Sequence, residues 1–211
     1  MHKNRMSIVL ASAFLLSFSN LAGAATLALT DPIGTHAGVG LDLIFGWTFS
    51  VNAPITVTSL GLYDQDDFGL FDTHEVGLFR LSDQSLMGSV AVPAGTCGTV
   101  LDHFCFENVS PFDLAEGTYV VVMTMPKGTA DSQVILATSF STPSEITYIT
   151  SVLDPKSTLT FPSSALNGVL GPGMFGPNFT FTSAPVPEPS TCSAIGAEIL
   201  ALLALARRRN R

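Results

Sequence analysis

Apolar and polar residues alternate with a period of two in several short stretches of the chain, beginning at residue 47. These stretches are rich in β-branched and aromatic residues, and clusters of Gly, Pro, Asp and Ser separate them, so each predicts a β-strand. The predicted strands cover residues 47–51, 55–61, 75–81, 86–92, 103–109, 118–125, 134–140, 145–153 and 175–183. Residues 25–46 have no clean period and predict a short strand and a loop.

No sustained helical stripe with capping residues occurs between Ala25 and Ala184. Many short strands separated by turn residues are typical of an all-β domain, and we predict a β-sandwich of the jelly-roll-like kind over residues 25–184. The stretches 75–81 and 86–92, joined by a four-residue polar turn, predict a β-hairpin. The order of the strands does not follow from the pattern.

The two ends of the chain have a different pattern. His2 to Arg5 is basic, Ile8 to Phe18 is apolar, and Ala22 to Ala25 are small, which together predict a signal peptide over residues 1–24, cleaved near Ala25. In a bacterium, the mature chain would then lie beyond the inner membrane.

The other end, residues 185–211, begins with prolines, which favour an extended linker, and continues with an apolar run to Ala206. A helix from Ser190 to Ala206 would rise about 25 Å, somewhat less than the ~30 Å of a bilayer core. Arg207, Arg208, Arg209 and Arg211 follow and would stay cytoplasmic. Since Glu198 falls in mid-span, we expect a weak transmembrane helix, a temporary tether; the alternative is a helix packed on the domain.

The charge of the chain limits the kinds of partner that it can bind. Between Asp31 and Glu188 there are sixteen acidic residues and only three basic ones, a formal charge of −13. Such a surface repels phosphate backbones and anionic lipids, which argues against binding of nucleic acid or peripheral docking on a membrane. The charge suits solubility or the capture of cations.

The cysteine content is only partly consistent with an oxidising compartment, because there are three cysteines and one is left without a partner. Cys97 and Cys105 are close enough in sequence to close a short loop, and a disulfide between them is favoured over two reduced, buried thiols. Zinc is disfavoured because His103 is the only further ligand type near the pair. Cys192, at the start of the C-terminal apolar run, has no evident partner.

The acidic stretch from residue 63 to residue 75 is the one part of the chain whose residues are spaced like those of a known kind of binding site. Its oxygen-bearing positions follow the spacing of a calcium loop, except that Phe68 stands at the fifth position and strands replace the flanking helices. Calcium is therefore the one cofactor that the sequence suggests, and a solvated acidic turn is the alternative. The ligands would be Asp64, Asp66, Leu70, Asp72 and Glu75.

No catalytic residues are predicted. His36, His74 and His103 lie in separate elements, and no Gly-x-Ser-x-Gly elbow occurs. An acid pair for glycoside hydrolysis could be drawn from the acidic loop, but many acidic loops would supply such a pair. Aromatic side chains could form a platform on which sugars stack, but at period two most are expected in the core. Phe68 and Phe71, in the acidic loop, are expected to be exposed.

The C-terminal stretch resembles the PEP-CTERM sorting signal of Gram-negative bacteria, with a Pro187-Glu188-Pro189 motif, a short apolar helix and an arginine cluster in that order. The resemblance implies export across the inner membrane, transient anchoring and recognition by an exosortase, a membrane-embedded cysteine peptidase that cuts near the motif. It also implies an association with exopolysaccharide and biofilm loci.

The body of the chain is similar to an uncharacterised β-sandwich domain that recurs in PEP-CTERM proteins and has no assigned chemistry. The resemblance rests on Phe49-Ser50-Val51, 55–61, Gly69-Leu70, 74–78, 92–96 and 114–119. We therefore expect a non-enzymatic protein of the cell surface or extracellular matrix, associated with exopolysaccharide. The alternatives are a carbohydrate- or calcium-binding module that uses the loop from Asp64 to Glu75, and a hydrolase.

Overall fold

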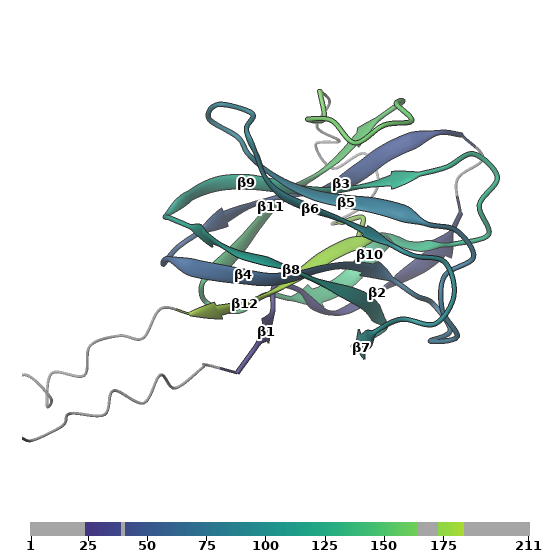
Figure 1. The fold of residues 1–211 in the computed structure, drawn as a ribbon, viewed down its shortest axis with the longest axis horizontal. Helices are drawn as coiled ribbons and strands as arrows, with labels where there is room; N and C mark the ends of the chain where they lie inside the picture. The colour runs from purple at the N-terminus through teal and green to yellow at the C-terminus, as the bar shows by residue number, and fades with distance from the viewer. Residues whose placement is uncertain (1–23, 39–40, 164–172, 184–211) are drawn as a thin grey trace, which may run out of the picture.

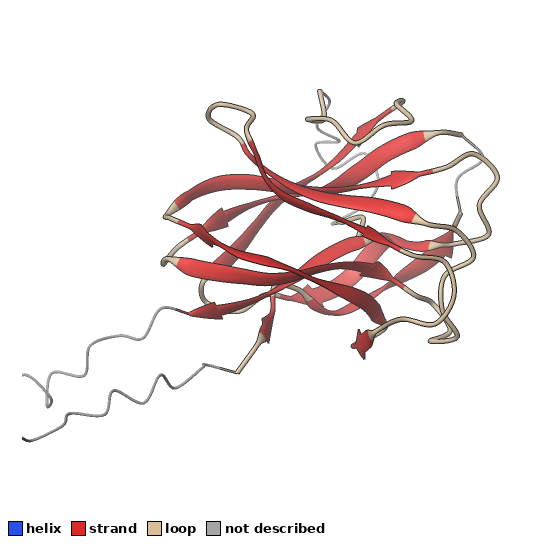
Figure 2. Cartoon of the chain, in the orientation of Figure 1, coloured by secondary structure: helices blue, strands red, loops and turns tan. Residues whose placement is uncertain are grey.

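A computed structural model describes residues 24–38, 41–163 and 173–183. These residues form strands, turns and loops only (Figure 2), as the sequence predicts, and none of them belongs to a helix that could cross a membrane. The signal peptide, the sorting motif, the tail helix with its arginines, and Cys192 lie outside the described residues, apart from Ala24 at the predicted cleavage site.

The described residues form twelve strands. They are β1 (Thr26–Leu27), β2 (Thr30–Ala37), β3 (Leu43–Val51), β4 (Ile55–Tyr63), β5 (His74–Arg80), β6 (Leu86–Val92), β7 (Thr99–Leu101), β8 (Phe104–Leu114), β9 (Gly117–Met125), β10 (Gln133–Ser141), β11 (Ile146–Asp154) and β12 (Pro177–Ser183).

Two five-stranded antiparallel sheets form the two layers of a sandwich (Figure 1). One has the strand order β1-β12-β4-β8-β7, and the other has the order β11-β3-β9-β5-β6. A separate pair, β10-β2, lies beside them. The all-β sandwich predicted from the alternating pattern is thus confirmed.

Aromatic side chains fill the space between the layers. Trp47 of β3 is fully buried, stacks on Phe179 of β12 with ring centroids 6.1 Å apart, and meets the edge of Phe175. Its indole N–H donates a 2.8 Å hydrogen bond to the carbonyl oxygen of Pro177. Because β3 and β12 belong to different sheets, this contact joins the two layers by both packing and a satisfied polar group.

Most predicted strands are confirmed, with differences at their limits, and β7 is not predicted. The hairpin of β5 and β6 forms as expected, whereas β3 begins four residues earlier than predicted. Residues 30–37 form β2, in the stretch 25–46 for which a short strand and a loop are predicted. The predicted strand 103–109 continues to Leu114 despite Pro111. A break in register opposite Val57 and Ser59 accommodates the proline, which is where an antiparallel strand tolerates one.

The first and last described strands adjoin. Thr26 of β1 pairs with Phe181 of β12, and Ser183 pairs with Ile55 at the start of β4. The acidic loop begins after Tyr63, at the other end of β4, which lies roughly 26 Å away at about 3.3 Å per residue. The sandwich therefore has one end where both chain termini of the domain lie and an opposite end that carries the acidic loop.

Candidate functional site

The acidic loop is held by its first carboxylate. Asp64 is 3% exposed, and its Oδ2 accepts a 2.8 Å hydrogen bond from the N–H of Gly69. Burial raises the pKa of Asp64; the Gly69 N–H opposes this rise and the Asp66 carboxylate adds to it. Gly69 has φ +101°, and a Cβ there would collide with the carbonyl of Gly95, so the turn requires glycine.

Asp131, between β9 and β10, ties the same loop to the sandwich. Its Oδ1 and Oδ2 accept the N–H groups of Phe71 and Asp72, each at 2.9 Å. Oδ2 also lies 2.8 Å from Nε2 of His74, whose Nδ1 lies 2.7 Å from the carbonyl oxygen of Thr124. Burial alone would raise the pKa of Asp131, but the hydrogen bonds from His74 and the two N–H groups outweigh it and lower the pKa.

The contact between His74 and Asp131 is buried. The two side chains are 0% and 4% exposed. Both imidazole nitrogens lie within hydrogen-bond distance of an oxygen, Nδ1 of the Thr124 carbonyl and Nε2 of the Asp131 carboxylate. Since its ring nitrogens are used in this way, His74 has a structural function in anchoring the loop. Nothing in the sequence pattern singles out Asp131, because Phe71, Asp72 and His74 are 57 to 60 residues away.

The five predicted calcium ligands are laid out along a loop that protein hydrogen bonds already hold. The carbonyl of Leu70 accepts the N–H of Gly95 at 2.8 Å, and Glu75 extends from β5 with an exposed side chain. Within the described ranges, no three His, Cys, Asp or Glu side chains are grouped to hold a metal ion. Calcium binding through Asp64, Asp66, Leu70, Asp72 and Glu75 stays a prediction.

Calorimetric titration of the full chain with calcium tests this prediction. Binding would supply the carboxylates with a countercharge, and the Leu70 carbonyl, which already accepts the Gly95 N–H, would bind the ion with its second lone pair. Heat of binding below millimolar calcium, lost in Asp66→Asn but kept in Asp113→Asn, is the expected result. Absence of heat at millimolar calcium would exclude a functional calcium loop.

Cys97 and Cys105 form a disulfide with their Cα atoms 5.3 Å apart. It joins the segment after β6 to the start of β8. The segment also carries Gly95, which exchanges two backbone hydrogen bonds, of 3.1 and 2.8 Å, with Leu70 of the acidic loop. The disulfide thus fixes the strand-connecting segment on which the acidic loop rests.

The exposed aromatics are those expected. Phe68 is 83% exposed and Phe71 is 66% exposed, and both flank the tip of the acidic loop. Trp47 and Tyr119 are buried in the core, as the period-two pattern predicts. The two phenylalanines therefore form an apolar surface beside carboxylates at the end of the sandwich remote from the termini.

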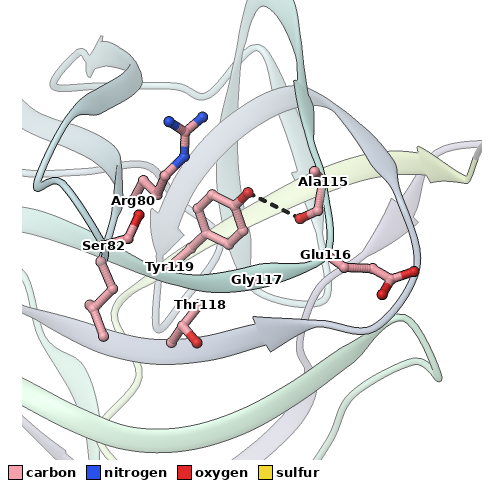
Figure 3. A pocket seen from close by; sticks show the side chains of 8 residues that line it. Arg80, Ser82, Ala115, Glu116, Gly117, Thr118 and Tyr119 are labelled. Atoms are coloured by element: carbon pink, nitrogen blue, oxygen red, sulfur yellow. Dashed lines mark hydrogen bonds between the residues drawn. The ribbon is translucent and has the colours of Figure 1, made fainter.

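A recess of about 550 Å³ lies at the opposite end, around the turn between β8 and β9 (Figure 3). The hydroxyl of Tyr119 donates a 3.0 Å hydrogen bond to the carbonyl of Ala115, which fastens this turn. Arg80 lies at the rim, where its guanidinium is 3.1 Å from the Asp83 carboxylate. The recess thus combines a structural tyrosine with one of the few cations of the domain.

The remaining imidazoles have separate partners. Nε2 of His36 lies 3.0 Å from the hydroxyl of Tyr63, and Nδ1 of His103 lies 3.0 Å from the Asp67 carboxylate. Among the hydrogen bonds of the described residues, none joins an imidazole to a serine hydroxyl or a thiol.

No protein-family model matches the sequence, and no curated protein or solved structure matches it either.

Proposed function

We propose that the chain is an exported protein of the cell surface or extracellular matrix, sorted by an exosortase and serving as a non-enzymatic structural component associated with exopolysaccharide. The single observation that carries the proposal is the C-terminal order of Pro187-Glu188-Pro189, an apolar run and four arginines. The inner membrane would hold the tail transiently, with the arginines on the cytoplasmic side.

Three features of the described domain support export. A disulfide between Cys97 and Cys105 is the chemistry of an oxidising compartment. The acidic surface keeps an extracellular domain soluble and away from anionic lipid. The N- and C-terminal strands pair with each other, so a tail leaving β12 would hold the domain by one end and turn its acidic loop outward.

We also propose that the sandwich is a jelly roll. Four antiparallel pairs are nested in the sequence: β1 with β12, β3 with β9, β4 with β8, and β5 with β6. A long hairpin whose arms pair in this nested way and then wind into two sheets is the pattern of a jelly roll. In this description β7, β11 and the β10-β2 pair are additions to the eight strands.

A carbohydrate-binding module is the second candidate function. The specific observation that favours it is the exposure of Phe68 and Phe71 beside the carboxylates of the acidic loop, because sugars stack on exposed aromatic rings and donate hydroxyls to carboxylates. Binding of the purified chain on a glycan array, and its loss in Phe68→Ser with Phe71→Ser, would support a lectin-like function over a purely structural one.

Deletion of Val186–Arg211 tests the sorting proposal. In the producing bacterium, the truncated chain is expected to lose surface retention and to accumulate in the periplasm or the medium, because the exosortase has no motif to recognise. A chain with Arg207, Arg208, Arg209 and Arg211 changed to Gln is the matched variant, since it keeps the motif and the apolar run. Unchanged surface retention of the truncated chain would contradict the proposal.

A further inference from the structure

A cleft of about 280 Å³ opens at the end of the sandwich remote from the termini. It lies between β2, the end of β4 and the turn that joins β7 to β8. The side chains that the argument uses are Asp31, Ile33, His36, Tyr63, Asp102 and His103, all of which line it.

Aromatic rings form one wall of this cleft. The imidazole of His36 stacks on the ring of Tyr63 with centroids 5.5 Å apart and planes inclined by 25°. The ring of His103 also lies near Tyr63, with centroids 6.3 Å apart. Tyr63 is 5% exposed, whereas His36 and His103 are exposed, so the two imidazoles present ring surface to a ligand. Ile33, 60% exposed, adds an apolar surface beside them.

The cleft also carries carboxylates that lack a basic partner. Oδ2 of Asp102 accepts the N–H of Asp31 at 2.7 Å, and among the described residues no lysine or arginine contacts either carboxylate. The negative field is visible at Tyr63, where burial and then the charges of Asp67, Asp102 and Asp64 raise the pKa of the hydroxyl. A cationic group entering the cleft would therefore find acceptors whose charge the domain leaves uncompensated.

The backbone around the cleft holds these groups in place at some cost. Asp31, Asp102 and His103 have φ of 50°, 50° and 61°, in the left-handed region that residues other than glycine seldom adopt. In Asp102 and His103 this is the geometry of a two-residue turn between antiparallel strands. The turn directs an acid and an imidazole to the same opening.

We propose that this cleft binds glucosamine units of a polysaccharide whose amino groups are free. This proposal rests on the proposed association with exopolysaccharide and specifies which class of polysaccharide the protein binds. The ammonium group donates to the carboxylates of Asp31 and Asp102, while the apolar face of the sugar ring lies on His36 and Ile33. Polymers of uronic acids are excluded by the charge of −13 between Asp31 and Glu188.

Calorimetry on the full chain in detergent tests the proposal. The probe is a glucosamine oligomer, compared with a fully N-acetylated oligomer of equal length and an oligomer of a uronic acid. The glucosamine oligomer is expected to bind, and the N-acetylated oligomer to bind at least about tenfold more weakly because it lacks the ammonium charge. Equal binding of the two would overturn the proposal.

Variants locate the binding. Asp31→Asn with Asp102→Asn keeps side chains that tolerate left-handed φ and removes two charges, so the fold is retained and affinity for the glucosamine oligomer falls at least about tenfold. Glu107→Gln with Glu116→Gln removes the same charge elsewhere and is expected to change affinity less than about threefold. Equal losses of affinity in the two double variants would show that the oligomer is attracted by the overall charge, and would overturn the proposal of binding in the cleft. Neither result affects the sorting proposal, which depends on localisation.

Discussion

Replacement of Asp131 by alanine is expected to lower the free energy of unfolding by about 3–5 kcal/mol. The change leaves the buried imidazole of His74 without its anion, and it frees the N–H groups of Phe71 and Asp72. Because His74 is completely buried, the cost is that of buried polar groups left without partners and not that of a surface salt bridge. Urea denaturation followed by tryptophan fluorescence measures it through Trp47.

Asp72→Ala is the matched control for this prediction. Asp72 lies in the same loop, but the bond to Asp131 comes from its backbone N–H, which alanine retains. Its effect is expected to stay within about 0.5 kcal/mol, as for most surface substitutions. A cost below about 1 kcal/mol for Asp131→Ala would show that the contact with His74 does not anchor the loop.

Replacement of both Cys97 and Cys105 by serine is expected to lower the free energy of unfolding by about 2–3 kcal/mol. The two residues are 8 positions apart, so the bond removes the closure entropy of a short loop from the unfolded chain. The effect should also loosen the contact of Gly95 with Leu70, since the disulfide holds the segment that carries Gly95.

A reductant supplies the control for the disulfide prediction. Dithiothreitol is expected to lower the urea midpoint of the native chain to that of the double serine variant and to leave the variant itself unchanged. Equal midpoints for the oxidised native chain and the variant would mean that the disulfide contributes no stability.

Alternating patterns and apolar runs in the sequence were sufficient to predict the central strands. In β9, the run from Thr118 to Met125 is buried along most of its length, and its apolar sequence between Gly117 and Pro126 predicts a strand directly. The strands outside the centre of the sheets were harder to predict. Residues 30–37 form β2 although they contain Pro32 and Gly34, because pairing with β10 supplies hydrogen bonds that the local sequence does not announce.

The functional end could be predicted only in part. Exposure of Phe68 and Phe71 followed from their place in a polar loop, and the disulfide followed from short spacing. Asp131 could not be found in this way, because its importance arises from contacts with residues far away in the chain. Asp31 and Asp102 likewise meet only after folding, 71 positions apart.

The geometry of the domain indicates which end of the sandwich the tail would hold. Because β1 and β12 pair, a tether that leaves β12 would hold the sandwich at the end where Arg80 and the β8–β9 turn lie. The cleft around His36 and Tyr63 would then face away from the membrane, toward the surrounding matrix. Cleavage of the tail would release or transfer the domain without altering that end.

Mass spectrometry of the chain recovered from the cell surface or medium tests the sorting account most directly. The account predicts a mature protein that begins near Ala25 and ends close to the Pro187-Glu188-Pro189 motif, with the apolar run and the arginines removed. It also predicts that cells lacking the exosortase keep the uncut C-terminus. Recovery of surface chains that still end at Arg211 in cells with an active exosortase would contradict the account.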